Sequence, residues 1–256
     1  IMLPLTIKLP VKPKPEGSTP MSKKHALAAI LAAATVTAAD AGNAATIVID
    51  EFVAPQYVVA RAPSGSFARS EIRAPSTVAV GGYRDMSVTN STNRLNGTSL
   101  ETGDGYLDFN NASRTSGTGT ITWDGQNSTG LRGLDVTDGG TNDAVFFSVV
   151  FADADIAMAF SITDTQGRVS TFNTLLVEEL SDPAEVIFRF SDFSGSADFT
   201  QVNAISFTLI GTRPAVDASL DRIYFGATVA PVPLPATAPL LFAAMGGLAF
   251  AARRRK

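Results

Sequence analysis

The sequence predicts an all-β fold, an antiparallel β-sandwich or barrel, between residues 46 and 230. Short apolar or alternating runs recur there, separated by clusters of Gly, Asp, Asn, Ser and Pro. Alternation with a period of two is typical of half-buried strands, and such clusters are typical of turns. No segment of this region keeps the 3.6-residue apolar period of an amphipathic helix over ten residues. Many short strands joined by frequent turns favour the sandwich.

The strands are expected where these runs occur. In chain order they are Thr46–Val53, Gln56–Ala60, Arg84–Thr89, Gly105–Phe109, Thr118–Trp123, Ala144–Phe151, Ala157–Thr163, Val169–Val177, Val186–Phe190, Ala204–Ile210 and Asp221–Ala227. The sequence Asp-Thr-Gln-Gly at Asp164–Gly167 predicts a tight hairpin loop between two of them. Two clusters rich in Ser, Thr, Asn and Gly, Asn90–Gly103 and Asn110–Gly117, are expected to be loops.

Phenylalanine dominates the predicted core. The expected core set is Phe146, Phe147, Phe151, Phe160, Phe172, Phe188 and Phe207. Aromatic side chains bury a large apolar area, so packing alone explains this set.

The first 45 residues carry the pattern of a targeting segment. Prolines interrupt any helix within residues 1–20, and Met21 opens a better start. A pair of lysines then precedes an apolar run, Ala26–Ala38, and the small residues at 41–45 are typical of a cleavage site. We expect residues 1–20 to be an upstream extension foreign to the natural chain.

Residues 21–45 are therefore interpreted as a signal peptide, cleaved near Ala44 or Ala45. A short buried helix at Ala26–Thr35 is the alternative. Residues 46–230 would then form a domain outside the cytoplasm.

Charge is distributed unevenly along the chain. From residue 45 to residue 230 there are 11 Arg and no Lys against 22 carboxylates, a net charge of -11, whereas the whole chain carries -4. An acidic surface repels phosphate backbones, so we expect no nucleic-acid partner.

Composition also excludes several kinds of chemistry. The sequence has no Cys, and its one His, His25, lies in the expected signal peptide. A domain without Cys, His or Lys has no thiolate or imidazole nucleophile system, no His-ligated zinc and no Schiff-base lysine. We therefore do not expect an enzyme.

Three features follow Ala230 in order. A proline motif comes first, formed by Val232, Pro233, Leu234, Pro235 and Ala236; an apolar run, Leu240–Ala252, comes second, and the cations Arg253, Arg254, Arg255 and Lys256 come last. The uncharged stretch from Ala236 has 17 residues, which is at the lower limit for a membrane-spanning helix. Terminal cations favour the cytoplasmic side, so the acidic domain would face outward.

Residues 231–256 resemble the PEP-CTERM sorting signal in its VPLPA variant. The resemblance rests on the proline motif, the apolar run and the arginine cluster, although Leu234 stands where the family pattern has Glu. It implies recognition by an exosortase, a membrane protease that processes such tails. It further implies an inner-membrane-anchored precursor and a final place at the cell surface or in the extracellular matrix.

Residues 46–230 also resemble the β-rich domains that precede such tails. The motifs behind this second resemblance are Trp123-Asp124-Gly125, Gly133–Thr137 with Gly139-Gly140, Phe151–Asp153, Asp164–Gly167 and Ser191–Phe193. It implies a jelly-roll-like sandwich and no particular activity.

An oxygen-rich cluster is a candidate calcium site. Its residues are Asp135, Asp138, Asn142 and Asp143. Calcium takes six to eight oxygen ligands, but Asp and Asn are also ordinary turn residues, and the spacing fits no EF-hand.

Aromatic side chains are candidates for stacking on sugar rings. Trp123 is the main candidate, with Asp124 beside it as an acceptor for sugar hydroxyls, and Tyr83, Tyr106 and Tyr224 are others. A single Trp at the end of a strand is more often part of the core.

The sequence thus favours an exported, non-enzymatic envelope or matrix protein associated with exopolysaccharide. A carbohydrate-binding module, supported by calcium or not, is the alternative. A glycoside hydrolase using two carboxylates is a distant one, because adjacent residues such as Glu178 and Glu179 point to opposite faces of a strand.

Overall fold

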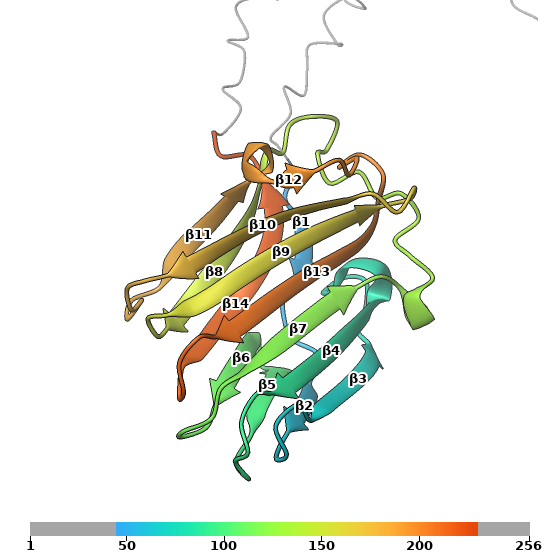
Figure 1. The fold of residues 1–256 in the computed structure, drawn as a ribbon. Coiled ribbons are helices and arrows are strands. Elements are labelled where there is room, and N and C mark those ends of the chain that lie inside the picture. Colours follow the sequence, from blue (N-terminus) through green and yellow to red (C-terminus); the bar gives the residue numbers. More distant parts are fainter. Residues whose placement is uncertain (1–44, 230–256) are drawn as a thin grey trace, which may run out of the picture. The chain divides into compact units, whose positions relative to one another are not determined.

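A computed structural model describes residues 45–229, which form an antiparallel β-sandwich of two seven-stranded sheets (Figure 1). The first sheet has the order β11 (Ala184–Arg189), β8 (Ala144–Ala152), β14 (Asp217–Gly226), β6 (Tyr106–Asn111), β5 (Thr98–Gly103) and β2 (Gln56–Ala60), and β1 (Ile47–Asp50) also pairs with β14. The second sheet has the order β12 (Ser194–Gly195), β10 (Val169–Leu176), β9 (Ile156–Asp164), β13 (Val202–Gly211), β7 (Gly117–Trp123), β4 (Tyr83–Asn90) and β3 (Phe67–Arg73). The predicted all-β sandwich is confirmed.

Helical structure in this part of the chain is limited to three short 3-10 turns. They are η1 (Val80–Gly82), η2 (Gln126–Ser128) and η3 (Phe190–Asp192). Within residues 45–229 no helix is long and apolar enough to cross a membrane. The expected signal peptide and the expected C-terminal helix lie outside the described residues.

Each strand expected from the sequence overlaps an observed one, but three observed strands were not expected. They are β3, β5 and β12. The prediction of a loop over Asn90–Gly103 was wrong at its end, because β5 begins at Thr98. Its polar residues suggested a loop, whereas pairing with β2 on one side and β6 on the other holds it as a strand.

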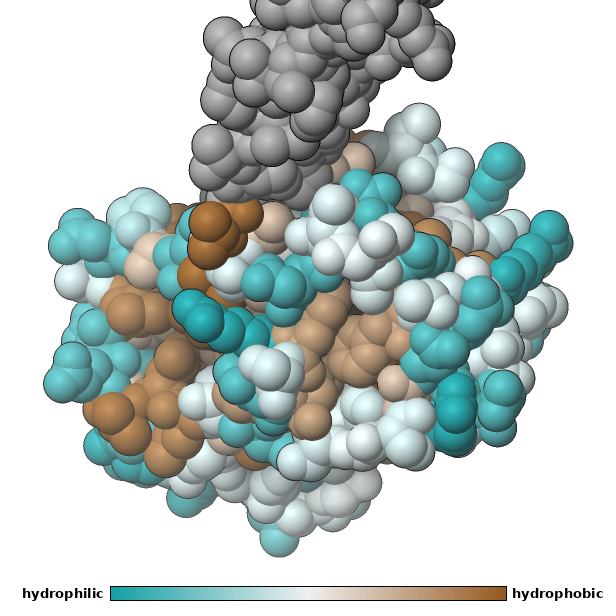
Figure 2. Space-filling view, turned by 90° about the horizontal axis from the view of Figure 1, so that it is seen from above, coloured by the Kyte–Doolittle hydropathy of each residue, from teal (hydrophilic) through white to brown (hydrophobic). Residues whose placement is uncertain are grey.

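The core lies between the two sheets and is rich in phenylalanine, as expected. Phe147, Phe160, Phe188 and Phe207 are buried, and the ring centroids of Phe147 and Phe207 lie 4.9 Å apart. Seen from above, apolar groups on the visible face are interrupted by polar ones (Figure 2). The buried apolar side chains form one cluster between the sheets.

Two phenylalanines of the expected core lie instead on the outer face of the first sheet. Phe146 is still buried, with 7% of its surface exposed, and it stacks on Tyr224 with ring centroids 4.9 Å apart. Phe151 lies opposite Ser219, next to a register shift between β8 and β14. Such a bulge adds one residue to a strand and reverses the alternation beyond it, so Phe151 faces outward although Phe147 faces the core.

A buried polar network joins the sheets at one end of the core. Arg84 of β4 donates from Nη1 to Asp50 of β1 (3.0 Å), from Nε to Gln56 of β2 (2.9 Å) and from Nη2 to Thr102 of β5 (2.7 Å). Trp123 of β7 donates from Nε1 to Asp50 Oδ2 over 2.8 Å. Arg84 and Asp50 are fully buried, so their charges are compensated by each other and by these hydrogen bonds.

Candidate functional site

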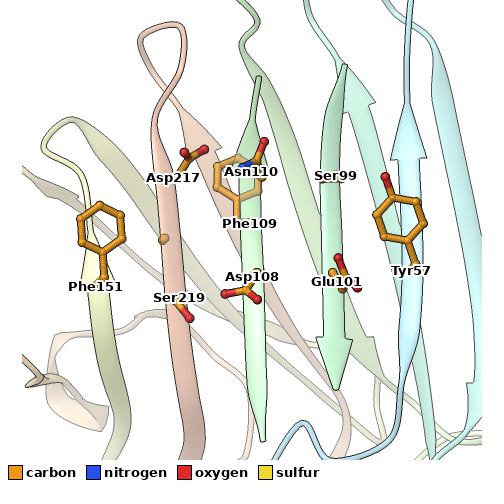
Figure 3. A pocket seen from close by; sticks show the side chains of 10 residues that line it. Tyr57, Ser99, Glu101, Asp108, Phe109, Asn110, Phe151, Asp217 and Ser219 are labelled. Atoms are coloured by element: carbon orange, nitrogen blue, oxygen red, sulfur yellow. The ribbon is translucent and has the colours of Figure 1, made fainter. Parts of the chain in front are cut away.

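The outer face of the first sheet carries a straight row of side chains across five strands. Tyr57 of β2 lies opposite Glu101 of β5, which lies opposite Asp108 of β6. Asp108 lies opposite Ser219 of β14, and Ser219 lies opposite Phe151 of β8. Figure 3 shows these residues on neighbouring strands. With strands about 4.8 Å apart, the row is about 19 Å long.

A second row runs beside the first, two residues further along each strand. In it Ser99 of β5 pairs with Asn110 of β6, and Asn110 pairs with Asp217 of β14 (Figure 3). Tyr106 lies on the same face of β6 as Asp108, because successive side chains of a strand alternate between faces. The face therefore combines aromatic, carboxylate, amide and hydroxyl groups.

These rows line an open groove of about 400 Å³, a volume within the usual range for ligand pockets. Its lining residues are Tyr57, Ser99, Glu101, Asp108, Phe109, Asn110, Phe151, Asp217, Ala218 and Ser219. Tyr57 is 53% exposed, and Tyr106, just beyond the groove, is 45% exposed. Both rings present apolar surface and a hydroxyl to solvent.

The groove contains an unfavourable arrangement of charge. Glu101 and Asp108 lie directly opposite each other, with Cβ atoms about 5 Å apart by the geometry of paired strands, and like charges so placed destabilise a sheet. Within residues 45–229 the side chains of Tyr57, Glu101 and Asp108 make no hydrogen bond with protein groups. Like-charged neighbours without hydrogen-bond partners lower the stability of the fold. Such unfavourable arrangements are expected at functional sites, where a ligand can compensate for them.

Asp217 extends the negative charge of the groove. Burial raises the pKa of its carboxyl, the backbone N–H of Asn111 lowers it through a 2.9 Å hydrogen bond, and the charge of Asp153 raises it again; the net pKa lies above the usual value. No Arg or Lys lines the groove. The guanidinium of Arg222, on the same strand, instead lies over the ring of Tyr224, 4.5 Å from its centroid. The groove therefore presents acceptors of hydrogen bonds without a balancing cation.

Trp123 and Asp124, the expected glycan-binding residues, do not belong to this face. Trp123 is 0% exposed and donates its indole N–H to Asp50, so its ring cannot stack on a ligand in this conformation. Asp124 follows β7 in the second sheet and is half-buried, and its Oδ1 has no hydrogen-bond partner within the described residues. The expectation that Trp123 contacts sugar is corrected by its burial.

Of the other tyrosines considered from the sequence, only Tyr106 is beside the groove. Tyr83 begins β4 in the second sheet, and Tyr224 lies farther along β14, where its hydroxyl donates to Glu185.

The expected calcium ligands act as anchors of their own loop. Asp135 Oδ1 accepts from the N–H and the hydroxyl of Thr137, and Asp143 accepts from the N–H and the hydroxyl of Thr228. Asp138 and Asn142 contact Ala45. Within residues 45–229 no group of three or more acidic, His or Cys side chains is arranged to hold a metal ion. These oxygens thus serve as turn and anchor acceptors here.

Glu178 and Glu179, the adjacent carboxylates considered for hydrolysis, are exposed residues after the end of β10 and are absent from the groove. The sorting motif, Val232, Pro233, Leu234, Pro235 and Ala236, and the arginines Arg253, Arg254 and Arg255 lie outside the described residues.

The carboxylates of the groove were not predicted as a site. Glu101 fell within an expected loop, and Asp108 lay in a predicted strand without any indication of its partner. The signal present in the sequence was the alternation of polar outward residues in Tyr106–Asn111, whose burial pattern alternates strictly in the structure.

Fold and groove together define a β-sandwich with an open, acidic face that carries aromatic side chains. No protein-family model matches the sequence, and no curated protein matches it.

Solved structures with some similarity do exist. The family 11 carbohydrate-binding module from Clostridium thermocellum in complex with a β-1,3-1,4-mixed-linked tetrasaccharide has 9% identity and a TM-score of 0.37, and the alignment covers 73% of this chain and 98% of that one. A solution structure of CtCBM11 has 11% identity and a TM-score of 0.38, covering 75% and 99%. The agarase AgWH50C has 11% identity and a TM-score of 0.42, covering 72% of this chain and 25% of that one. At these scores the similarity establishes neither a family nor a ligand.

Proposed function

We propose that residues 46–230 form a carbohydrate-binding module, a jelly-roll-like sandwich that binds a polysaccharide along the groove of the first sheet. The observation that carries the proposal is the outward row of Tyr57, Glu101, Asp108 and Ser219, whose side chains make no hydrogen bond within residues 45–229.

Sugar rings have apolar faces and a rim of hydroxyls, and the groove offers a complement to each. The exposed ring of Tyr57 provides a stacking surface. Glu101 and Asp108 accept hydrogen bonds from hydroxyl donors, and Asn110 both donates and accepts. Hydroxyl donors placed between the two carboxylates would also reduce their mutual repulsion.

The shape of the groove favours a chain over a single small molecule. The row crosses five strands, about 19 Å in all, and the groove that it lines is open to solvent. Ligand binding to such a face needs no lid and leaves both ends of the ligand free, as a polysaccharide requires.

The negative charge of the groove limits the kinds of polysaccharide that can bind to it. Three carboxylates, Glu101, Asp108 and Asp217, line it, and no Arg or Lys does. Uronate, sulfate or phosphate groups would meet like charge at close range, which costs binding energy. We therefore expect neutral or amine-bearing glycans to bind and strongly anionic ones to be rejected.

The site is proposed to bind rather than to hydrolyse. Hydrolysis needs one carboxylate on each side of the scissile bond. Glu101 and Asp108 are instead neighbours in one row of one sheet, and they project from the same surface.

A glycan array probed with the exported protein tests the proposal. Tyr57→Ala removes the stacking ring and should weaken binding. Glu101→Gln removes a charged acceptor, whose hydrogen bond is worth about 1.5–3 kcal/mol, so the affinity should fall by about 10–150-fold. The matched controls are Tyr83→Ala in the second sheet and Glu178→Gln, an exposed carboxylate away from the groove. Neutral glycans should bind the wild type and both controls.

Two results would refute the proposal: no binding to any neutral or amine-bearing glycan, or equal binding by Tyr57→Ala, Glu101→Gln and wild type. Release of reducing sugar from a bound glycan would show that the face is catalytic instead.

We further propose that this module is carried to the cell surface or the extracellular matrix by the export and sorting segments of residues 21–45 and 231–256. The support is the order of proline motif, apolar run and arginine cluster in the sequence. Pro233→Ala with Pro235→Ala should leave membrane insertion intact and block processing by an exosortase, measured by fractionation and immunoblotting. Unchanged size and location of this double variant would contradict the sorting proposal.

A further inference from the structure

The loop between β7 and β8 contacts the chain just before β1 and just after β14. At one end, Asp138 Oδ2 accepts a 3.1 Å hydrogen bond from the backbone N–H of Ala45. At the other end, Asp143 accepts from the backbone N–H (2.6 Å) and the hydroxyl (2.7 Å) of Thr228. A single loop therefore contacts the residues where the sandwich begins and ends.

Hydrogen bonds within the loop hold the conformation that makes these contacts. Asp135 accepts hydrogen bonds from Thr137 and from the N–H of Gly139, which folds the chain tightly around Asp138. Hydrogen bonds from the Thr137 hydroxyl first, and from the two backbone N–H groups after it, lower the pKa of Asp135 despite the opposing effect of burial. Asp138 itself adopts a positive φ of 48°, a conformation that Asp and Asn tolerate better than most residues.

Asn142 makes a second contact with Ala45. Its Nδ2 donates to the carbonyl oxygen of Ala45 over 3.1 Å and to that of Val136 over 3.3 Å. Asn142 is only 3% exposed, and its Oδ1 is buried without a hydrogen-bond partner in the described part of the chain. Buried amide oxygens normally have a donor, so the amide that contacts Ala45 through its Nδ2 also carries an unused acceptor.

We infer that the chain is cleaved between Ala44 and Ala45, and that Asp138 and Asn142 form the receiving site for the new N-terminus. The inference rests on the proposed export by a signal peptide. Hydrolysis adds water across the amide: the Ala44 carbonyl becomes a carboxylate, and the Ala45 nitrogen becomes an ammonium with three protons and a positive charge. The peptide N–H of Ala45 donates one uncharged hydrogen bond to Asp138. An ammonium would instead form a charge-assisted hydrogen bond with Asp138, and its other protons could serve the Oδ1 of Asn142, which has no partner within residues 45–229.

The small residues at 41–45 suit cleavage there, but they allow several positions. The contacts of Ala45 favour cleavage directly before it, because the new ammonium would then lie at Asp138. Cleavage one residue later would remove Ala45 and leave both Asp138 and Asn142 without this partner. Cleavage at Ala44–Ala45 also leaves β1, which begins at Ile47, complete.

The ion pair has a measurable signature in the α-amine. An ordinary N-terminal amine has a pKa of about 7.7–8.0, and a neighbouring carboxylate favours the charged form and raises it. For an exposed pair we expect the pKa of the α-amine to rise by about 0.1–0.7. Because the folded pKa is raised, the stabilisation is complete below the unfolded pKa and is lost as pH rises through the folded one.

The test uses the full-length chain in a host that exports it. Mass spectrometry of the exported protein identifies the N-terminal residue, and the pH dependence of labelling by an amine reagent gives the pKa of the α-amine. The variants are Asp138→Asn, which keeps the loop conformation, and Asp182→Asn, an exposed carboxylate in the β10–β11 connection, as the matched control.

The expected result is a chain beginning at Ala45 with a raised α-amine pKa in wild type and Asp182→Asn, and an ordinary one in Asp138→Asn. A mature chain beginning at Thr46 or elsewhere would overturn the inference while leaving export intact. A chain beginning at Ala45 whose amine titrates alike in all three proteins would overturn the role of Asp138. An unprocessed chain outside the cytoplasm would overturn both export and the inference.

Discussion

The buried pair Asp50–Arg84 allows a demanding test of how the two sheets are held together. In Arg84→Met the guanidinium is replaced by an apolar side chain, and Asp50 keeps only hydrogen bonds from Trp123 and from the N–H of Phe52. Removing one member of a buried ion pair leaves an uncompensated charge and costs about 3–5 kcal/mol. Because the free energy of unfolding of a native protein is about 5–15 kcal/mol, the variant should lose a large part of its stability.

Protonation of Asp50 should relieve part of this loss. In the wild type, burial already raises the pKa of the Asp50 carboxyl, and the charge of Arg84 opposes that rise. Without Arg84 the folded-state pKa rises further above the unfolded one. An acid raised in this way binds more protons in the folded state, so the stability of Arg84→Met should increase as the pH is lowered toward the unfolded pKa.

Urea unfolding followed by tryptophan fluorescence provides the assay, because Trp123 is the only tryptophan in the sequence and belongs to the network. The double variant Asp50→Asn with Arg84→Met removes the unpaired charge and keeps an acceptor for the indole. It should be more stable than Arg84→Met alone by about 1–3 kcal/mol. A loss below about 1 kcal/mol in Arg84→Met, or a double variant no more stable than it, would refute this account of the network.

Two further predictions concern single carboxylates, and a third concerns secondary structure. Burial, together with the charges of Glu71 and Asp124, raises the pKa of Asp85 to about 6, so its ionised form is unfavourable at pH 7; Asp85→Asn should raise the Tm at pH 7 and not at pH 4, and equal shifts in calorimetry would contradict this. Burial raises the pKa of Asp164, but the N–H groups of Asp198, Arg168 and Gln166 and the Arg168 guanidinium outweigh it and lower the pKa to about 2. Its contribution is therefore present above the unfolded pKa and lost as pH falls through about 2; thermal melts of Asp164→Asn should differ from wild type at pH 6 and converge near pH 2, and a constant difference would argue against it. Far-UV circular dichroism of the purified protein should show a β spectrum, and a helical one would contradict the fold.

The fold class was determined by local sequence pattern. Alternating runs such as Thr118–Trp123 and the hairpin residues Asp164–Gly167 produced the expected strands and turn, and the N–H of Gly167 donates to the carbonyl of Asp164 as the hairpin requires. These signals are local because strand alternation and turn conformation depend on neighbours in the chain. The acidic, lysine-free composition likewise determined the sign of the surface charge.

The candidate site was decided by contacts between distant segments. Glu101 lies in a stretch that the sequence suggested was a loop, and it becomes part of a row only because β5 pairs with β2 and β6. Phe151 faces the groove because of a bulge, and Trp123 is withdrawn from solvent because Asp50, 73 residues earlier, accepts its indole N–H.

The all-β fold was thus predictable from the chain itself, and the structure confirms it, whereas export stays a prediction from the sequence. Which side chains meet on the outer face of the first sheet was not predictable, because register across a sheet fixes the neighbours of every outward residue. A shift of one position would turn Glu101 and Asp108 toward the core. Register depends on the packing of the whole sandwich, so only the tertiary structure could bring Tyr57, Glu101 and Asp108 into one row.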